Sequence, residues 1–170
     1  MSILETKVSP CNIGPECEAL AIDGAFLIHN LTPTSGKTFY QYAIQDVVPR
    51  IEQYGSKYQR TDVIFDVYVS QSLKAETRSK RGHRNRRRVT GNGKVPPNWK
   101  GFLRNEENKT ELFLFHADEL VKHCNKSQVV VTKGDTVVCN TSCDVDCLDE
   151  FNHAEADTRL FVHVTDMVRH

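Results

Sequence analysis

Four acidic side chains occupy positions from which they could bind a divalent cation. Asp23 and Asp66 each end a short apolar run of strand length, and Glu155 and Asp157 form a Glu-x-Asp pair at the start of a helical pattern. Carboxylate oxygens are the ligands that Mg²⁺ and Mn²⁺ prefer, and two such ions about 4 Å apart can activate a water and stabilise the leaving oxygen of a phosphodiester. The pattern therefore predicts a Mg²⁺ or Mn²⁺ site with these four carboxylates as ligands.

A basic segment follows Asp66. Residues 74–94 contain nine Lys or Arg and one acid, although the whole chain has a net charge of zero. Such side chains bind the phosphates of nucleic acid without reading its bases, and their affinity falls with salt. We therefore expect sequence-independent contacts with a nucleic-acid backbone. The candidate binding residues are Arg78, Lys80, Arg84, Arg86, Arg87 and Arg88.

The elements that must position these side chains alternate between strand and helix patterns. Apolar, β-branched runs predict strands at residues 19–23, 62–69, 128–132 and 136–139, the last two forming either a hairpin or one strand and an edge. Helical patterns cover residues 37–54, 72–81, 99–124 and 153–170. This order predicts an α/β fold whose central sheet is mostly parallel and covered on both faces. In such sheets ligands bind outside the carboxyl ends of the strands, where Asp23 and Asp66 are expected.

Three finer expectations follow from the same patterns. Residues 19–23 are expected to be a fully buried strand, and Pro49 is expected to bend or divide its helix. The last helix is expected to bury one apolar stripe. That stripe comprises Asp157, Leu160, Phe161, Val164 and Val168.

Length and composition indicate one domain. The 170 residues are 39% hydrophobic and 26% charged, as is usual for globular proteins. The sequence has no apolar run of membrane-spanning length and no recognisable secretory signal, so we expect an intracellular protein without membrane contact. Residues 1–17 are expected to be a loose arm before a domain at 18–170. The six cysteines are expected to be free thiols, as is usual in an intracellular protein. Cys139, Cys143 and Cys147 lack the second pair that a zinc site needs.

Two strand-end blocks and one helix start resemble a known family. The blocks are Leu20-Ala21-Ile22-Asp23-Gly24 and Val63-Ile64-Phe65-Asp66, and the helix start is Leu73-Lys74-x-Glu76-x-x-x-Lys80-Arg81. They resemble the metal-binding strands and the helical arch of PIN-like nucleases, in the flap-endonuclease and XPG branch. The chain is also similar to uncharacterised PIN-like open reading frames near animal mobile elements.

The resemblance implies a three-layer α/β/α PIN-like domain with an arch-like segment at residues 72–98. It further implies that Lys74 and Arg81 contact the scissile phosphate, and that Glu155 and Asp157 bind metal as the family's Glu-Ala-Glu-Ala acids do. The implied reaction is hydrolysis of a phosphodiester in DNA or RNA, with single-stranded or 5′-flap substrates.

The sequence also departs from the family. Asp66 is followed by Val67 where the family usually has Gly, and the family's last metal-binding strand, with its Asp-x-Asp pair, has no counterpart before His170. Asp166, inside the helix, does not match that pair. The sequence therefore indicates a domain truncated at its C-terminus, in which the second metal is poorly held.

Other functions remain open at this point. A catalytically incomplete nucleic-acid-binding module would use the same basic segment, which could instead be a nuclear-import tract. Residues 34–38 look like the end of a phosphate-binding loop, but Leu31 stands where that loop needs Gly. Isolated histidines such as His116 and His163 are expected to be packing or surface residues. The sequence predicts no oligomeric state.

Overall fold

The computed structural model describes residues 17–34, 36–67, 86–142, 148 and 156–169. Two sequence predictions concern segments that lie largely outside these residues: the N-terminal arm and the helix at 72–81. Within the last helix, side chains are described from Thr158 to Val168.

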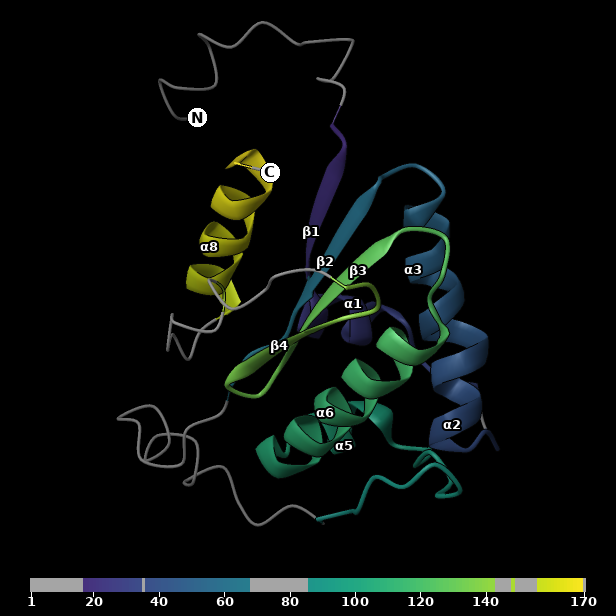
Figure 1. The fold of residues 1–170 in the computed structure, drawn as a ribbon. Helices are drawn as coiled ribbons and strands as arrows, with labels where there is room; N and C mark the ends of the chain where they lie inside the picture. The colour runs from purple at the N-terminus through teal and green to yellow at the C-terminus, as the bar shows by residue number, and fades with distance from the viewer. Residues whose placement is uncertain (1–16, 35, 68–85, 143–147, 149–155, 170) are drawn as a thin grey trace, which may run out of the picture.

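A four-stranded sheet forms the centre of the molecule (Figure 1). Its strands are β1 (Ala19–Asp23), β2 (Arg60–Ile64), β3 (Gln128–Lys133) and β4 (Thr136–Cys139), in the spatial order β1-β2-β3-β4. The pairs β1–β2 and β2–β3 are parallel, and β3–β4 is antiparallel. The predicted mostly parallel sheet is therefore confirmed. The two last strands form a hairpin, whose turn uses Gly134 at a φ of 61°, a conformation that favours glycine.

Two strand predictions need correction. All five residues of β1 are half-buried rather than fully buried, because β1 is the outermost strand of the described sheet and pairs on one side only. The strand predicted at 62–69 instead runs from Arg60 to Ile64. Its pairing with β1 stops at the Asp23–Ile64 pair, since the chain turns from β1 into a helix at Gly24.

The remaining described elements are helices. Pro49 does not divide the expected 37–54 helix, because residues 39–55 are helical without a break; the proline lies in the first turn of an α-helix that directly follows a π-helical segment. The predicted 99–124 helix is broken once, near Asn105. The helices are α1 (Gly24–Asn30), α2 (Phe39–Tyr42), η1 (Ala43–Val47), α3 (Val48–Gly55), α5 (Trp99–Leu103), α6 (Glu106–His123) and α8 (Ala156–Arg169).

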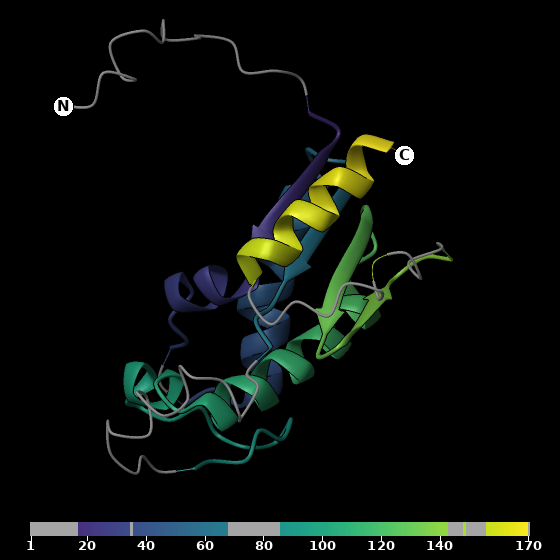
Figure 2. The same cartoon turned by 90° about the vertical axis from the view of Figure 1, so that its left-hand side faces the viewer.

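The two faces of the sheet carry different cores. Val63 and Val131 point into a large apolar cluster that also contains residues of α3 and α6. Val130 and Val137 point the other way, into a small cluster with Leu148 and Val162 of α8. Figures 1 and 2 show the same division, with α8 on one face of the sheet and α3 and α6 on the other.

The buried stripe predicted for the last helix is wrong. Phe161 is 75% exposed, Val164 43% and Val168 84%. The side chains that α8 buries are instead those of Arg159 and His163. Helical periodicity located the apolar stripe correctly but could not show which stripe the sheet selects, because Arg60 and Asp62 of β2 are polar and bind polar partners.

Candidate functional site

Two of the four predicted metal ligands leave the sheet at the same edge. Asp23 is the last residue of β1 and pairs in register with Ile64, the last residue of β2. Asp66 follows two residues later, about 7 Å further if the chain stays extended. The structure therefore brings Asp23 and Asp66 to the carboxyl ends of adjacent parallel strands, where ligands bind in open α/β sheets.

Asp23 also has a structural role. Its Oδ1 accepts a hydrogen bond of 3.0 Å from the backbone N–H of Phe26 and thereby caps α1. The cap uses one carboxylate oxygen, so the other oxygen lies outside this hydrogen bond. Gly24 comes next because the ring of Phe65 occupies the space that a Cβ would need. This contact fixes the start of α1 against the end of β2, between the two aspartates.

The other two predicted ligands, Glu155 and the side chain of Asp157, lie outside the described part of the structure. Asp66 is described and is half-buried. Lys74, Arg78, Lys80, Arg81 and Arg84 lie outside the described part as well. Among the described residues, no three His, Cys, Asp or Glu side chains form a group that could hold a metal ion.

The end of the basic segment is bound to acids of α6. Arg86 pairs with Glu107 and Glu111, both at 2.6 Å, and Arg88 lies 3.2 Å from Glu111. The other oxygen of Glu111 accepts from the backbone N–H of Val89 at 2.9 Å. Burial by itself would raise the pKa of Glu111, but these hydrogen bonds and charges lower it below its usual value.

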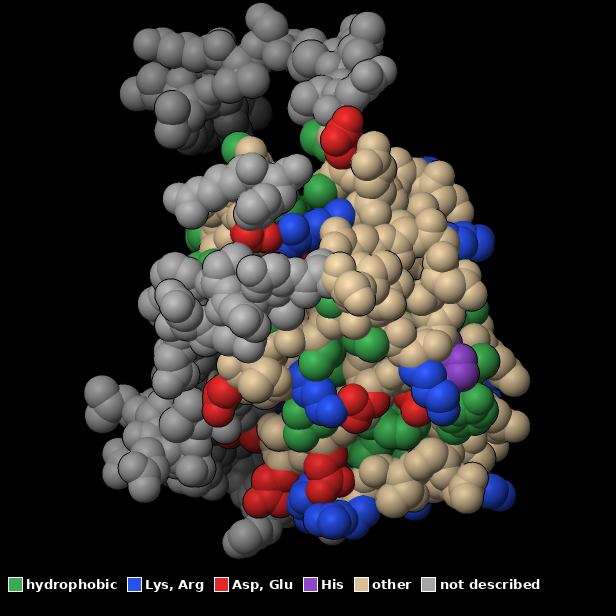
Figure 3. Space-filling model, viewed as in Figure 1, with side chains coloured by type: hydrophobic (Ala, Val, Ile, Leu, Met, Phe, Trp, Pro, Cys, Tyr) green, Lys and Arg blue, Asp and Glu red, His purple; other side chains and the backbone are tan. Residues whose placement is uncertain are grey.

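Residue 87 is fixed by its backbone, since its N–H donates to the Oδ1 of Asn108 at 2.8 Å. The side chain of Arg87 is exposed. Figure 3 shows Lys and Arg side chains interspersed with Asp and Glu over the lower part of this face, without a large patch of one sign.

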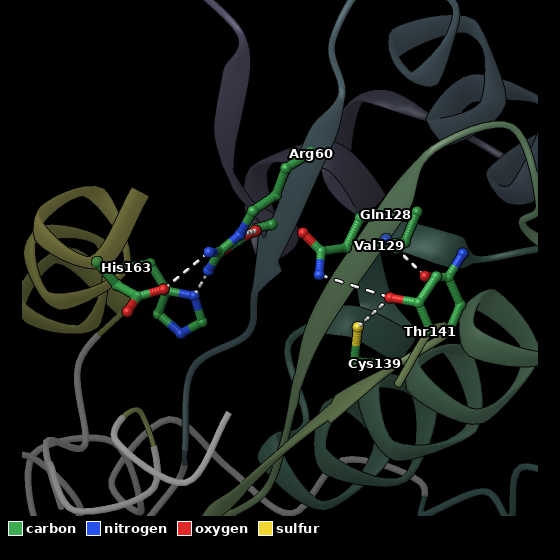
Figure 4. Close-up of polar contacts among 9 residues, drawn as sticks. Arg60, Gln128, Val129, Cys139, Thr141 and His163 are labelled. Carbon is green, nitrogen blue, oxygen red and sulfur yellow. Dashed lines mark hydrogen bonds and ion pairs between the residues drawn. The ribbon is translucent and has the colours of Figure 1, made fainter. Parts of the chain in front are cut away.

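A buried charge network joins β2 to α8 (Figure 4). Arg60 binds Asp62 in a bidentate manner, through Nε and Nη2 at 2.8 Å each. Its Nη1 donates to Asp166 at 2.8 Å, and the Nδ1 of His163 lies 2.7 Å from Asp62 Oδ2. Because an ionised carboxylate can only accept, Nδ1 carries the hydrogen. We call these four residues, Arg60, Asp62, His163 and Asp166, the β2–α8 network.

Hydrogen bonds and opposite charges stabilise the ionised side chains of the β2–α8 network. Burial by itself would lower the pKa of the Arg60 guanidinium, but the hydrogen bonds and charges of Asp62, and then of Asp166, raise it above its usual value. Asp62 is completely buried, and His163 is 1% exposed. Charges removed from water are tolerated only when they are paired and hydrogen-bonded, as these are.

Two features of the sequence indicate this network, although it was not among the predicted sites. Asp62 stands inside a buried strand, where a carboxylate needs a partner. His163 and Asp166 are three residues apart and therefore neighbours on a helix face. The prediction that His163 is a packing residue was correct about its burial but missed its hydrogen bond to Asp62.

A separate polar cluster holds the hairpin in place. Asn140 accepts from the backbone N–H of Val129 at 2.8 Å and donates to the carbonyls of Cys124 and Ser127 at 3.0 and 2.9 Å. Thr141 lies beside it, 3.3 Å from the sulfur of Cys139 (Figure 4). These contacts satisfy backbone groups at the start of β3, so the cluster has a structural role.

Known proteins do not extend this description. No protein-family model, curated protein or solved structure matches the chain. Within the described ranges, no helix is both long and apolar enough to cross a membrane.

Proposed function

We propose that this chain is a metal-dependent nuclease-like domain of the three-layer α/β/α PIN-like kind, which hydrolyses phosphodiester bonds in DNA or RNA. The observation that carries this proposal is the position of Asp23 and Asp66 at the carboxyl ends of adjacent, in-register parallel strands. Single-stranded or 5′-flap nucleic acid is the proposed substrate, and the protein is proposed to be intracellular, with the basic segment suited to nuclear import.

The residues at this edge suit Mg²⁺ or Mn²⁺. Asp23 and Asp66 offer only oxygen donors, which hard cations of this kind require. The capping bond uses Oδ1 of Asp23, and a carboxylate has enough lone pairs to cap a helix and bind a cation together. A cation bound here would activate water and neutralise negative charge on the phosphate.

Glu155 and Asp157 complete the proposed ligand set. Their spacing from residues of α8 predicts which of the two contributes more to metal binding. Glu155 stands one helical turn before Arg159 in the sequence, whereas Asp157 stands one turn before Phe161. Arg159 is buried and Phe161 is exposed. We therefore expect substitution of Glu155 to weaken metal binding more than substitution of Asp157.

The chain's basic residues are proposed to hold the substrate. Lys74 and Arg81 steady the scissile phosphate, while Arg78, Lys80, Arg84 and residues 86–88 bind the strand backbone without reading bases. Glu107 and Glu111 neutralise Arg86 in the absence of substrate. Phosphates must replace these carboxylates, so affinity is expected to fall steeply with salt.

The proposal is tested by cleavage of labelled single-stranded and 5′-flap DNA in Mn²⁺. We expect Asp66→Ala to abolish cutting and Asp118→Asn to leave it unchanged, since Asp118 of α6 pairs with Lys133 of β3 and is not one of the proposed ligands. Equal cutting by the wild type and Asp66→Ala would rule out the proposed site.

A second function is favoured by one observation. Asp23 has a structural role as the cap of α1. This role fits a catalytically incomplete nucleic-acid-binding module, in which the aspartate is kept as a cap and not as a metal ligand. Such a module would bind DNA without cutting it, and its melting temperature would not rise with Mn²⁺.

A further inference from the structure

We infer that the β2–α8 network, rather than apolar packing, positions α8 on the sheet and thereby brings the first turn of α8 to the carboxyl ends of β1 and β2. The positioning of the helix stands on the structure alone. Its consequence for metal binding rests on the proposed function.

Large apolar side chains of α8 are exposed, whereas polar side chains of this helix are buried. The large apolar side chains Phe161 and Val168 are 75% and 84% exposed, and Val162 is the apolar residue of α8 that packs in the small cluster. The opposite face makes hydrogen bonds to the sheet through Arg159, His163 and Asp166. The fully buried side chains among the described residues of α8 are therefore polar.

The contacts also fix the direction of α8. Asp166, near the end of the helix, binds Arg60 at the start of β2, and His163 binds Asp62 two residues further along. Later residues of β2 therefore contact earlier residues of α8, so the helix runs antiparallel to the strand. Figure 2 shows α8 beginning at the level where β1 and β2 end.

A third contact locates the start of the helix. Arg159 donates to the carbonyl of Gly134 at 2.8 Å. The parallel register of β2 and β3 runs to the Val63–Val131 pair, and Gly134 follows the last residue of β3, so Arg159 contacts the sheet where its parallel strands end. The first turn of α8, which contains Asp157, therefore lies at the edge of the sheet where β1 ends at Asp23 and β2 ends two residues before Asp66.

The network admits one register. A shift of α8 by one turn in one direction would replace His163 by Arg159 beside Asp62, but would place Val162 opposite Arg60. A shift in the other direction would place Met167 beside Asp62, and Met167 cannot donate a hydrogen bond to this carboxylate. Arg60 and Asp62 stay paired with each other in either shift, but the hydrogen bonds from Arg60 to Asp166 and from His163 to Asp62 are both lost, which is unfavourable in a buried site. Apolar packing alone would discriminate less between these positions.

The experiment measures amide hydrogen exchange of the full chain, comparing two double variants of α8. His163→Ala with Asp166→Ala removes the network's helix side chains, whereas Phe161→Ala with Val164→Ala removes apolar side chains of the other face. We expect the first variant to speed exchange in α8 at least tenfold while α6 stays protected, and the second to leave α8 unchanged. Unchanged exchange in the first variant, or equally fast exchange in both, would overturn the inference.

Conservative variants guard against general unfolding. His163→Gln keeps an N–H donor and Asp166→Glu keeps a carboxylate, so this pair should restore much of the protection that the alanine pair loses. If α6 loses protection in the alanine pair, the single variant Asp166→Asn is used. It must speed exchange in α8 alone, and a global change or none would contradict the inference.

Mn²⁺ titration followed by electron paramagnetic resonance separates this inference from the proposed function. If both hold, the His163→Ala and Asp166→Ala pair binds Mn²⁺ at least tenfold more weakly than the wild type, and the apolar pair binds normally. A wild type that binds no Mn²⁺ contradicts the proposed function but leaves the exchange result decisive for α8. Normal Mn²⁺ binding by a variant whose α8 is released would overturn the link between the two.

Discussion

The Oδ2 atom of Asp62 in β2 lies 2.7 Å from the Nδ1 atom of His163 in α8, 101 positions later in the chain. One buried carboxylate therefore links the central sheet to the last helix. Both carboxylate oxygens of Asp62 also accept hydrogen bonds from Arg60, through its Nε and Nη2 atoms. The following predictions concern this pair and other contacts that hold the proposed site together.

Asp62→Asn should lower the free energy of unfolding by about 3 kcal/mol, because it leaves the Arg60 charge and the His163 N–H with a weaker partner in a buried site. Urea denaturation measures this change. His163→Gln and the double variant complete a cycle, in which the double variant should cost less than the sum of the two single variants. Simple additivity would mean that Asp62 and His163 do not interact energetically.

Gly24→Ala should destabilise the protein by about 1–3 kcal/mol, the usual range for overpacking. The new Cβ would lie 2.5 Å from Cε1 of Phe65, which also stacks on Phe113. Gly91→Ala is the matched control, because its Cβ meets no atom closer than 3.6 Å. Thermal melting of both variants tests the prediction, and Phe65→Leu should rescue Gly24→Ala.

Stability should fall between pH 7 and pH 5 because of His116. Burial lowers its pKa to about 3, and neither ring nitrogen has a hydrogen-bond partner among the described residues. In the unfolded chain the imidazole binds a proton below about pH 6.5. Unfolding therefore takes up a proton between about pH 6.5 and pH 3, and the free energy of unfolding falls as the pH falls, by up to about 1.4 kcal/mol per pH unit.

His116→Leu removes this titration and keeps an apolar side chain beside Tyr42, whose ring packs edge-on to His116. Urea denaturation at pH 7 and pH 5 should show a smaller difference for the variant than for the wild type, by about 2 kcal/mol. His123→Gln is the control, since His123 is half-buried and pairs with Glu119. An unchanged difference in His116→Leu would contradict the assignment.

Glu111→Gln should strengthen binding to single-stranded DNA several-fold at low salt. The substitution removes the charge that Arg86 and Arg88 share, so their guanidinium groups become available to phosphates. Fluorescence anisotropy over a salt series measures the affinity, and Asp118→Asn removes one charge elsewhere on α6 as the control. Equal effects of both variants would indicate a change in overall charge only.

Cys124 should resist alkylation in the folded protein at pH 8. Burial, and secondarily the charge of Glu52, raise the pKa of its thiol to about 12, so little thiolate forms. Cys17 is exposed and should react readily with iodoacetamide. Peptide mass spectrometry distinguishes the two sites, and rapid labelling of Cys124 would contradict its burial.

The sequence by itself determined the local elements of this protein. Its apolar, β-branched runs predicted all four strands of the described sheet, and the break at Gly134 predicted that the last two form either a hairpin, as the structure shows, or one strand and an edge. Phe113, Ala117 and Leu120 recur at helical spacing in the sequence, and all three are buried in α6. These features follow from short-range sterics and periodicity, which neighbouring residues set.

The tertiary structure alone decided what depends on partners distant in sequence. Residues 19–23 form an edge strand, so their apolar pattern did not reveal their half-burial. The same limit applies to α8, which has an apolar stripe and a polar one. The sheet selects the polar stripe because Arg60 and Asp62 need charged partners more than Phe161 needs burial. A buried charge left unpaired costs more free energy than an exposed apolar side chain, and only the assembled sheet places that charge beneath the helix.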